Sequence, residues 1–217
     1  MSELTGRRIL VTGAGKGIGR ATVCLLAGKG ARVIAVARTR ADLESLAAET
    51  GCETVEADLA DADAVDGLIA RAGRVEDVVN CAGTTTLEPA SEFSRQTFEE
   101  IMAVNVRAPM ALSRDFARQA IERGGGGSIV NISSSSTHGG QPLMAAYVAA
   151  KSGVVGLTKS LAAYTRAKVL TEVGKDVPMG RAGQPAELAP VYVMLASEEA
   201  SYVSGATVAV TGGKPIL

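Results

Sequence analysis

The stretch Arg8-Ile9-Leu10-Val11-Thr12-Gly13-Ala14-Gly15-Lys16-Gly17-Ile18-Gly19 decides the fold of this chain. Its first five residues are a short apolar run, typical of a buried parallel strand. The glycine-rich residues lead into an apolar helix predicted over 20–27. A strand, a glycine-rich turn and a helix in this order bring backbone N–H groups and a helix N-terminus onto a pyrophosphate. The glycine spacing is Gly-x-x-x-Gly-x-Gly rather than Gly-x-Gly-x-x-Gly, but this placement favours nucleotide binding over a mere tight connection.

Further strands and helices alternate along the 217 residues. Strands are predicted at 32–37, 53–56, 77–80, 128–132 and 206–210. Helices are predicted at 42–49, from about 62, over 94–123 with an interruption near Pro109, from 144 to about 163, and at 185–195. This alternation predicts an α/β fold of the Rossmann type, a doubly wound parallel sheet with helices on both faces. Without an internal repeat, residues 1–217 are predicted to form a single domain.

The end of the second predicted strand bears on the choice of nucleotide. It lies about 20 residues after the glycines, where a carboxylate would bind the ribose 2′-hydroxyl of NAD. The residues there are Ala37, Arg38 and Thr39, with no acid. Arg38 offers a cationic fork for a 2′-phosphate, and Lys16 supplies a second positive charge. Both could simply face solvent, as basic residues commonly do. The missing carboxylate and the two cations favour NADP(H).

The other strand ends also carry polar or small residues. Asp58 either hydrogen-bonds an adenine amino group or caps the helix that begins near Ala62. Asn80 ends the fourth strand, and the small residues at 81–83 let the backbone pass close to a nucleoside. A hydroxyl cluster at 133–136 follows the fifth strand. Ligands of such sheets bind beyond the carboxyl ends of the strands, so these residues are expected to share one site.

Tyr147 and Lys151 stand four residues apart in an Ala-rich segment, so a helix stacks them one turn apart on one face. A Lys ammonium close to a phenol favours the phenolate, and such a phenol can exchange a proton near neutral pH. On its own, the spacing favours an exposed Tyr and Lys of an ordinary helix, and the rest of the chain changes that interpretation. Asn105 is a poor helix former in the middle of a long helix, which indicates a backbone break or a buried hydrogen bond.

Composition argues against several other classes of protein. The net charge is −1 and no basic stripe is present, so nucleic acid is not an expected partner. No apolar run approaches the roughly 20 residues of a membrane span, and the N-terminus does not read as a signal peptide. Cys24, Cys52 and Cys81 read as reduced thiols of a cytoplasmic protein. The single histidine, His138, has no Cys or His neighbours, so no metal site is expected.

Taken together, these pieces resemble the short-chain dehydrogenase/reductase family. The matching motifs are Thr12-Gly13-x-x-x-Gly17-x-Gly19, Asp58, Asn80-x-Ala82-Gly83, Asn105, Ser134 and Tyr147-x-x-x-Lys151. They cover about residues 5–163, and residues 178–213 resemble the family's C-terminal helix and strand. The first half is similar in particular to NADP-dependent carbonyl and xylulose reductases, with 3-oxoacyl-carrier-protein reductases as the alternative.

The resemblance implies an NADP(H)-dependent enzyme that reduces a small-molecule carbonyl or oxidises an alcohol. Tyr147 would exchange the proton, Lys151 would tune that phenol and hold the nicotinamide ribose, and Asn105 would hold a water relaying protons to Lys151. Ser134 would polarise the substrate oxygen; it is chosen over Ser133 because the family's serine usually stands thirteen positions before the tyrosine. Cofactor contacts are implied for Gly13, Gly15, Lys16, Gly17, Ile18, Gly19, Arg38, Thr39, Asp58, Leu59, Asn80, Ala82, Gly83, Tyr147 and Lys151.

The resemblance also implies a homo-oligomer, a tetramer or a dimer, paired through the long helices that carry Asn105 and Tyr147. A catalytically silent cofactor-binding protein, regulatory or structural, is the competing class of function. The intact Ser134, Tyr147 and Lys151 argue against that class.

One departure from the family lies after Leu161, where another strand, a Pro-Gly turn and a mobile substrate loop normally follow. Here residues 162–171 run directly into 172–178, without a Pro-Gly turn. Between residues 163 and 180 the chain must cross the sheet, about 15–20 Å for a strand of ordinary length. We therefore expect that about 30 residues, containing the sixth strand and the substrate loop, are missing at a join between Tyr164 and Val169.

Overall fold

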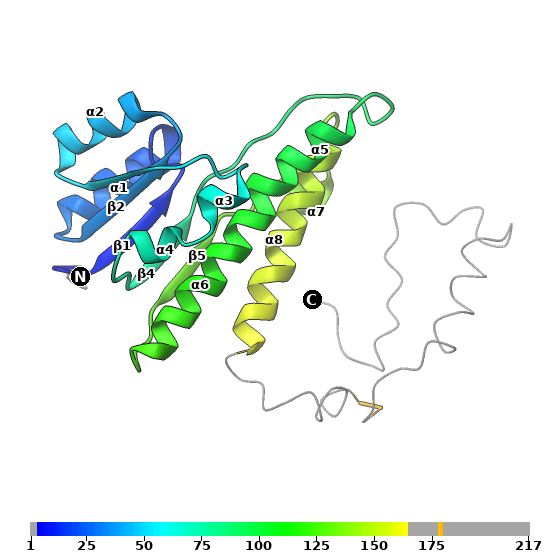
Figure 1. Ribbon diagram of the computed structural model, residues 1–217. Helices are drawn as coiled ribbons and strands as arrows, with labels where there is room; N and C mark the ends of the chain where they lie inside the picture. Colours follow the sequence, from blue (N-terminus) through cyan, green and yellow to red (C-terminus); the bar gives the residue numbers. More distant parts are fainter. Residues whose placement is uncertain (1–3, 165–177, 180–217) are drawn as a thin grey trace, which may run out of the picture. The chain divides into compact units, whose positions relative to one another are not determined.

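The computed structural model describes residues 4–164 and 178–179 (Figure 1). The chain divides into two compact units, Met1–Leu161 and Ala162–Leu217. The architecture below is that of the first unit, together with the end of the helix that leaves it. The predicted helix at 185–195, the predicted strand at 206–210 and the proposed join at 164–169 lie outside the described residues, apart from Tyr164 itself.

The sheet has five parallel strands in the order β3-β2-β1-β4-β5. They are β1 (Arg8–Thr12), β2 (Arg32–Ala37), β3 (Glu53–Glu56), β4 (Asp77–Asn80) and β5 (Ser128–Asn131). Val11 pairs with Ala35 on one side and Val79 on the other, which places β1 at the centre. The strand order reverses between β1 and β4, the point where open α/β sheets bind ligands. The predicted doubly wound α/β fold is confirmed.

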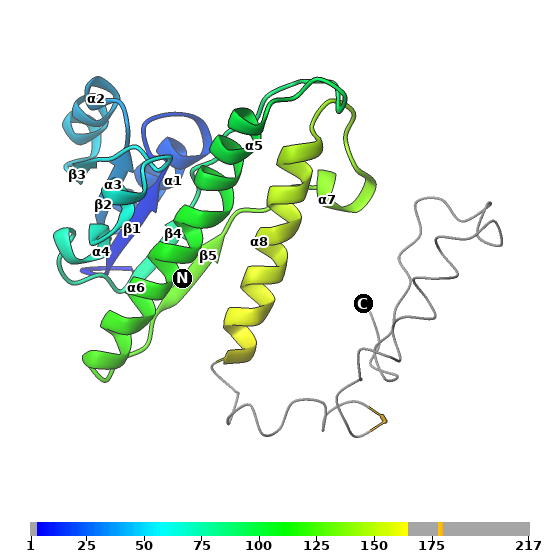
Figure 2. The ribbon, with the colours of Figure 1, turned by 45° about the vertical axis from the view of Figure 1, so that its right-hand side comes forward.

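Helices cover both faces of this sheet (Figures 1 and 2). They are α1 (Gly17–Gly28), α2 (Arg40–Thr50), α3 (Ala62–Val65), α4 (Leu68–Arg71), α5 (Arg95–Met102), the π-helical segment η1 (Ala103–Arg107), α6 (Ala108–Glu122), α7 (Ser136–Gly139) and α8 (Ala145–Tyr164). The last turns of α5 and the first turns of α8 pack together through Ile101, Ala146 and Ala150.

Alternating strand residues build a core on each face. On one face, Leu10, Ile34, Val36 and Val78 pack with α3, α4 and α6. On the other face, Ile9, Val11, Val33 and Ala35 pack with α1 and α2. Full burial of each large aliphatic side chain stabilises the fold by about 1.5–3 kcal/mol. The continuous apolar runs of β1 and β2 therefore serve both cores at once.

One carboxylate joins three strands at the amino edge of the sheet. Asp77 is only 8% exposed and accepts two hydrogen bonds from Arg7, at 2.9 Å from Nε and 2.8 Å from Nη2. Its Oδ1 also accepts from the backbone N–H of Ser128 at 3.0 Å. A bidentate, charge-assisted pair is strong and directional. Asp77 thus ties the starts of β1, β4 and β5 together.

The structure corrects two details predicted from the sequence. The long helix is interrupted at η1, not at Pro109; Pro109 lies in the first turn of α6, where the missing N–H costs little. The cap of α3 is Asp61, whose Oδ1 accepts from Asp63 N at 2.9 Å. Asp58 instead closes its own turn by accepting from Ala60 N at 2.9 Å, so it does not cap the helix.

Two predicted absences concern membranes and metals. Within residues 4–164, no helix combines the length and the apolar character that a membrane crossing requires. The same part of the chain holds no group of three or more His, Cys, Asp or Glu side chains arranged to bind a metal.

Candidate active site and cofactor groove

All the predicted site residues that follow strands gather at the carboxyl edge of the sheet. The glycine turn follows β1, Arg38 and Thr39 follow β2, and Asp58 follows β3. Asn80 ends β4, and the hydroxyl cluster at 133–136 follows β5. Since every strand is parallel, these five ends lie along one edge.

The glycine turn is packed too closely for larger residues. Gly13 has φ +67°, and a Cβ added there would lie 2.7 Å from Ala82 Cα. A Cβ on Gly19 would lie 2.2 Å from the carbonyl oxygen of Gly13. The buried Thr12 fixes this crossing, because its Oγ1 accepts from the N–H groups of Cys81 and Ala82, each at 3.1 Å. The turns after β1 and β4 are therefore packed and hydrogen-bonded against each other.

Tyr147 and Lys151 lie one turn apart on α8, as their spacing predicts. Lys151 Nζ is 5.8 Å from the centre of the Tyr147 ring and donates to the carbonyl oxygen of Ile132 at 2.8 Å. Lys151 is only 4% exposed. Burial lowers the pKa of Lys151, and the nearby Cys81 opposes that effect. The helix thus holds an ammonium group out of bulk water beside a phenol.

Asn105 lies in η1 and is fully buried. Its Nδ2 donates to the carbonyl oxygens of Thr84 at 2.8 Å and Ile101 at 2.9 Å. Within the described part of the chain its Oδ1 has no hydrogen-bond partner. A Cβ on Gly83 would lie 3.0 Å from this oxygen and 3.5 Å from Lys151 Nζ. A buried acceptor and a buried cation therefore border the same spot, and the acceptor is available to a water or a ligand.

The two candidate serines have different surroundings. Ser133 Oγ donates to the carbonyl oxygen of Lys151 at 3.3 Å, which ties it to the backbone of α8. Ser134 Oγ accepts from Ser136 N at 3.2 Å and from Ser136 Oγ at 2.9 Å. Ser134 is thus held by a neighbouring serine, and its hydroxyl is not tied to the backbone of α8. The geometry favours Ser134 over Ser133 as the residue that polarises a substrate oxygen.

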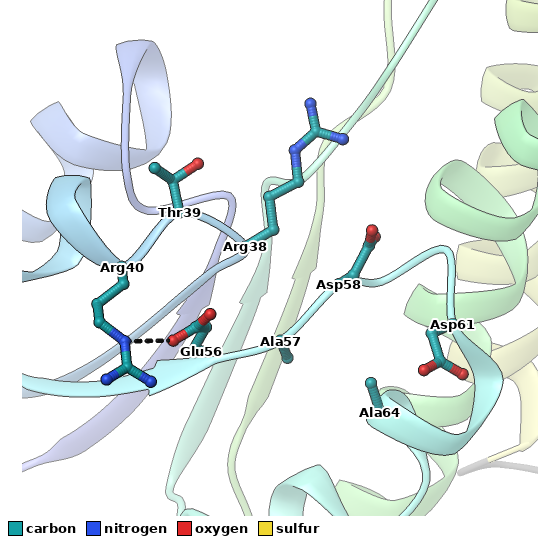
Figure 3. A pocket seen from close by; sticks show the side chains of 8 residues that line it. All are labelled: Arg38, Thr39, Arg40, Glu56, Ala57, Asp58, Asp61 and Ala64. Atoms are coloured by element: carbon teal, nitrogen blue, oxygen red, sulfur yellow. Dashed lines mark hydrogen bonds and ion pairs between the residues drawn. The ribbon is translucent and has the colours of Figure 1, made fainter.

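A cavity of about 660 Å³ opens at the ends of β2 and β3 (Figure 3). It is lined by Arg38, Thr39, Arg40, Glu56, Ala57, Asp58, Asp61 and Ala64. Arg40 is paired with Glu56 at 2.8 Å, and this bond raises the pKa of Arg40. Arg38 has no hydrogen-bond or ion-pair partner among residues 4–164, so its fork is open to an anion. The ammonium of Lys16 lies 3.4 Å from Asp42 Oδ2 in an ion pair whose lysine is largely exposed.

The sequence did not predict a series of side-chain hydrogen bonds that links the strands of the site to α8. Asn80 Nδ2 donates to Asn131 Oδ1 at 2.8 Å, and Asn131 Nδ2 donates to Thr158 Oγ1 at 3.0 Å. The chain joins β4, β5 and α8, the helix of Tyr147 and Lys151. The available signal was an asparagine inside the apolar run that forms β5.

Comparison with known proteins shows similarity along nearly the whole chain. A family model described as short chain dehydrogenase matches residues 7–172, and one described as enoyl-(acyl carrier protein) reductase matches residues 164–214. L-xylulose reductase of Bos taurus is 37% identical, with 97% of each chain covered. A carbonyl reductase of Sus scrofa, whose name specifies NADPH, is 36% identical, again with 97% of each covered.

A solved structure supports the same grouping. The crystal structure of a metagenomic short-chain oxidoreductase in complex with NADP has a TM-score of 0.71 and is 35% identical. The match covers 76% of this chain and 79% of that one. The parallel sheet agrees with this structural match. This chain belongs to the short chain dehydrogenase family.

Proposed function

We propose that this protein is an NADP(H)-dependent oxidoreductase that reduces the carbonyl group of a small molecule, or oxidises the corresponding alcohol. The observation that carries the proposal is the buried Lys151, 5.8 Å from the Tyr147 ring and next to the unpartnered Asn105 Oδ1. Strongly buried ionisable groups at the ligand edge of an α/β sheet are typical of catalytic sites. The names of the relatives agree with this class of reaction.

The residues at the carboxyl edge of the sheet fit both the adenosine end and the nicotinamide end of NADP(H). At the adenosine end, the open fork of Arg38 in the 660 Å³ cavity suits a 2′-phosphate, and Asp58 offers a carboxylate to the adenine amino group. At the nicotinamide end, the orphaned Asn105 Oδ1 and Lys151 Nζ meet at Gly83. Between the two ends, α1 begins at Gly17 and points its first N–H groups toward the pyrophosphate position.

Bound NADPH supplies a hydride, and the protein orients the substrate and manages the proton. Ser134 Oγ donates a hydrogen bond to the carbonyl oxygen, where negative charge develops, and keeps its proton. Tyr147 gives that oxygen a proton as it becomes an alcohol. Lys151 stabilises the phenolate that remains, because its ammonium lies beside the ring. Asn105 accepts a hydrogen bond from a water that returns a proton toward Lys151.

Two alternatives follow from the same site. A 3-oxoacyl thioester reductase would run this chemistry on an acidic carrier, which requires a basic patch at the entrance. A catalytically silent cofactor-binding protein would keep the groove without turnover, and the departure after Leu161 is the feature that favours it. We also propose a cytoplasmic homo-oligomer, a tetramer or a dimer, in keeping with the free thiols of Cys24, Cys52 and Cys81.

The decisive experiment follows NADPH oxidation with a panel of ketones, ketoses and acetoacetyl thioesters, in the wild type and in Tyr147→Phe. We expect turnover with small ketones or ketoses, and a loss of at least about a hundredfold in kcat in the variant, because the phenol carries the proton. NADPH affinity, measured by calorimetry, should change little. Near-normal turnover by Tyr147→Phe would rule out this assignment. Tight NADPH binding without turnover on any substrate would favour the silent protein.

A further inference from the structure

The η1 segment presents side chains to both ends of the cofactor groove. Asn105 points inward and is fully buried, whereas Arg107, two residues later, is exposed. The guanidinium of Arg107 donates through Nη2 to the carbonyl oxygen of Ala60. Ala60 lies in the turn between Asp58 and Asp61, and both of these residues line the adenosine-side cavity (Figure 3). A segment that follows β4 by more than twenty residues thus reaches the turn that follows β3.

The Asp58–Asp61 turn is otherwise held mainly by bonds to itself. Ala60 N donates to Asp58 Oδ1 at 2.9 Å, and Asp61 N donates to Asp58 O at 3.1 Å. Leu59 anchors the middle of the turn in the core at 7% exposure. These contacts fix the shape of the turn, and Ala57 N, just before it, donates to Ala37 O at 3.0 Å. Apart from Arg107, no side chain of the described residues outside the turn hydrogen-bonds its backbone between Asp58 and Asp61. Arg107 supplies such a bond, and a charged donor to a carbonyl is stronger than a neutral one.

We propose that Arg107 is a positioning residue for the adenosine end of the cofactor, acting through the Asp58–Asp61 turn and without touching the 2′-phosphate. The inference rests on the proposed function, because it takes the cavity to be the adenosine site. One interrupted helix would then set both ends of the groove, with Asn105 at the nicotinamide end and Arg107 at the adenine end. In this proposal Arg107 fixes the position of the Asp58 side chain, whereas Arg38 supplies the charge that binds the 2′-phosphate.

The chain offers a matched control one heptad further on. Arg114 lies in α6, seven residues after Arg107 of η1; it pairs with Asp115 at 2.7 Å and donates to Asp66 Oδ1, just after α3, at 3.3 Å. Both arginines therefore connect the helix that carries η1 to the α3 region, but only Arg107 reaches the turn at the cavity. Loss of Arg114 tests whether general docking of α3 is what matters.

The experiment measures binding to Arg107→Ala, Arg107→Lys and Arg114→Ala, using the full chain. The probes are adenosine 2′,5′-bisphosphate, NADPH and NADH by calorimetry, and reduced nicotinamide mononucleotide, which lacks the adenosine, in turnover. For Arg107→Ala we expect the dissociation constants of all three adenosine probes to rise by about tenfold, the worth of one charge-assisted hydrogen bond. Turnover with the mononucleotide should stay unchanged, Arg107→Lys should restore part of the affinity, and Arg114→Ala should bind as the wild type does.

Each other outcome overturns the proposal. A loss confined to NADPH and the bisphosphate would mean that Arg107 reads the phosphate directly. An equal loss of turnover with the mononucleotide would mean that Arg107 only supports Asn105. Equal weakening in Arg114→Ala would assign the effect to docking of α3, and unchanged binding in Arg107→Ala would leave Arg107 without this role. Failure of the wild type itself to bind NADPH would instead refute the proposed function, so the two failures are distinguishable.

Discussion

The buried ammonium of Lys151 destabilises the folded state, but the proposed reaction needs a cation beside Tyr147. Its ammonium is buried at 4% exposure, and its hydrogen bond to Ile132 does not offset the lost hydration, since burial lowers the pKa of Lys151. A buried cation of this kind destabilises the folded state at neutral pH. The site retains it, in the function proposed above, because the phenol of Tyr147 needs a cation beside it. Stability is thus traded for chemistry at a single side chain.

The buried Lys151 predicts that the free energy of unfolding depends on pH differently in the wild type and in Lys151→Met. The pKa of Lys151 is lower in the folded state than in the unfolded state, so its contribution to stability is best above the unfolded pKa and worsens as pH falls through the folded pKa. The wild type should therefore gain stability relative to Lys151→Met as pH rises toward the unfolded lysine value, about 10.4. Urea unfolding of both proteins between neutral and alkaline pH measures the difference. A constant difference across that range would show that Lys151 is not held in a costly position.

Arg38 is the residue from which we expect cofactor choice. Replacing Arg38 by Asp removes the open fork and places a carboxylate where it can bind the ribose 2′-hydroxyl. The dissociation constant for NADPH should rise by at least about tenfold, while that for NADH falls. Arg40→Asp is the control, because Arg40 lines the same cavity but is already paired with Glu56. If both variants shift the NADPH-to-NADH ratio equally, the general charge of the cavity sets the preference, and not Arg38.

At the level of helices and strands, apolar runs and glycines predicted the five described strands to within one residue, and α1, α2 and α8 to within three. Local signals did not suffice where tertiary contacts decide. Pro109 indicated a helix break, yet the break is η1; the break or buried hydrogen bond predicted at Asn105 is confirmed, since Asn105 lies in η1 and its amide donates to Thr84 and Ile101. Asp58 and Asp61 are equally good caps by type, and only the course of the turn selects Asp61. The short helix α7 lies in a Ser- and Gly-rich stretch without any periodic pattern.

The site shows the same division between local and tertiary information. The spacing of Tyr147 and Lys151 predicted their common face, and the strand ends predicted which residues share an edge. The role of Asn131 was not predictable, because it depends on β4 and α8 meeting around β5. Nor was the reach of Arg107 to Ala60, which joins residues 47 positions apart.

The Asn80–Asn131–Thr158 chain leads to a prediction about the packing of α8. Asn131→Leu removes the acceptor of the buried Asn80 Nδ2 and should cost about 1–3 kcal/mol of unfolding free energy. Asn131→Asp keeps the acceptor for Asn80 Nδ2 and loses only the donor to Thr158, whose hydroxyl already donates to Val154 O, so it should cost less than Asn131→Leu. Urea denaturation of the two variants measures both values. Equal losses would mean that the shape of Asn131, and not its hydrogen bonds, joins β4, β5 and α8.

For the molecule as a whole, we propose that a segment present in its relatives is missing near residue 164. The alignment with L-xylulose reductase spans 237 residues, whereas this chain has 217, so at least 20 aligned positions of that relative have no counterpart here. The first family model ends at residue 172 and the second begins at residue 164. The longer alignment supports a missing segment, and the join between Tyr164 and Val169 stays a prediction. The steps from Ala163 to Val173 that would test it by Cα spacing lie almost wholly outside the described residues.

Inserting such a segment should complete the substrate-binding part of the site and raise activity. Inserting about 30 residues, the sixth strand and substrate loop of the bovine relative, between Tyr164 and Val169 should raise kcat/KM for small ketones by at least about tenfold. Binding of adenosine 2′,5′-bisphosphate should be the same in both chains, since its site is built from residues before 110. Equal kcat/KM in the two chains would show that the 217-residue form is complete for catalysis.

The hydrogen bonds of Asp77 to Arg7 and Ser128, here called the Asp77 tie, have a consequence for synthesis on the ribosome. The central strand β1 is made first, but its carboxylate partner stands 70 residues later, and the third strand of the tie begins at Ser128. Helices α1 and α2 can cover one face of nascent β1 and β2 before β4 is made, but the face of Leu10, Ile34 and Val36 must wait for β4 and α6 to leave the exit tunnel. Such delayed, long-range pairing slows folding and lengthens the period in which a nascent chain can aggregate. Arg7 and Asp77 close the centre of the sheet once β4 has emerged, and the emergence of β5 sets the earliest moment at which the tie is complete.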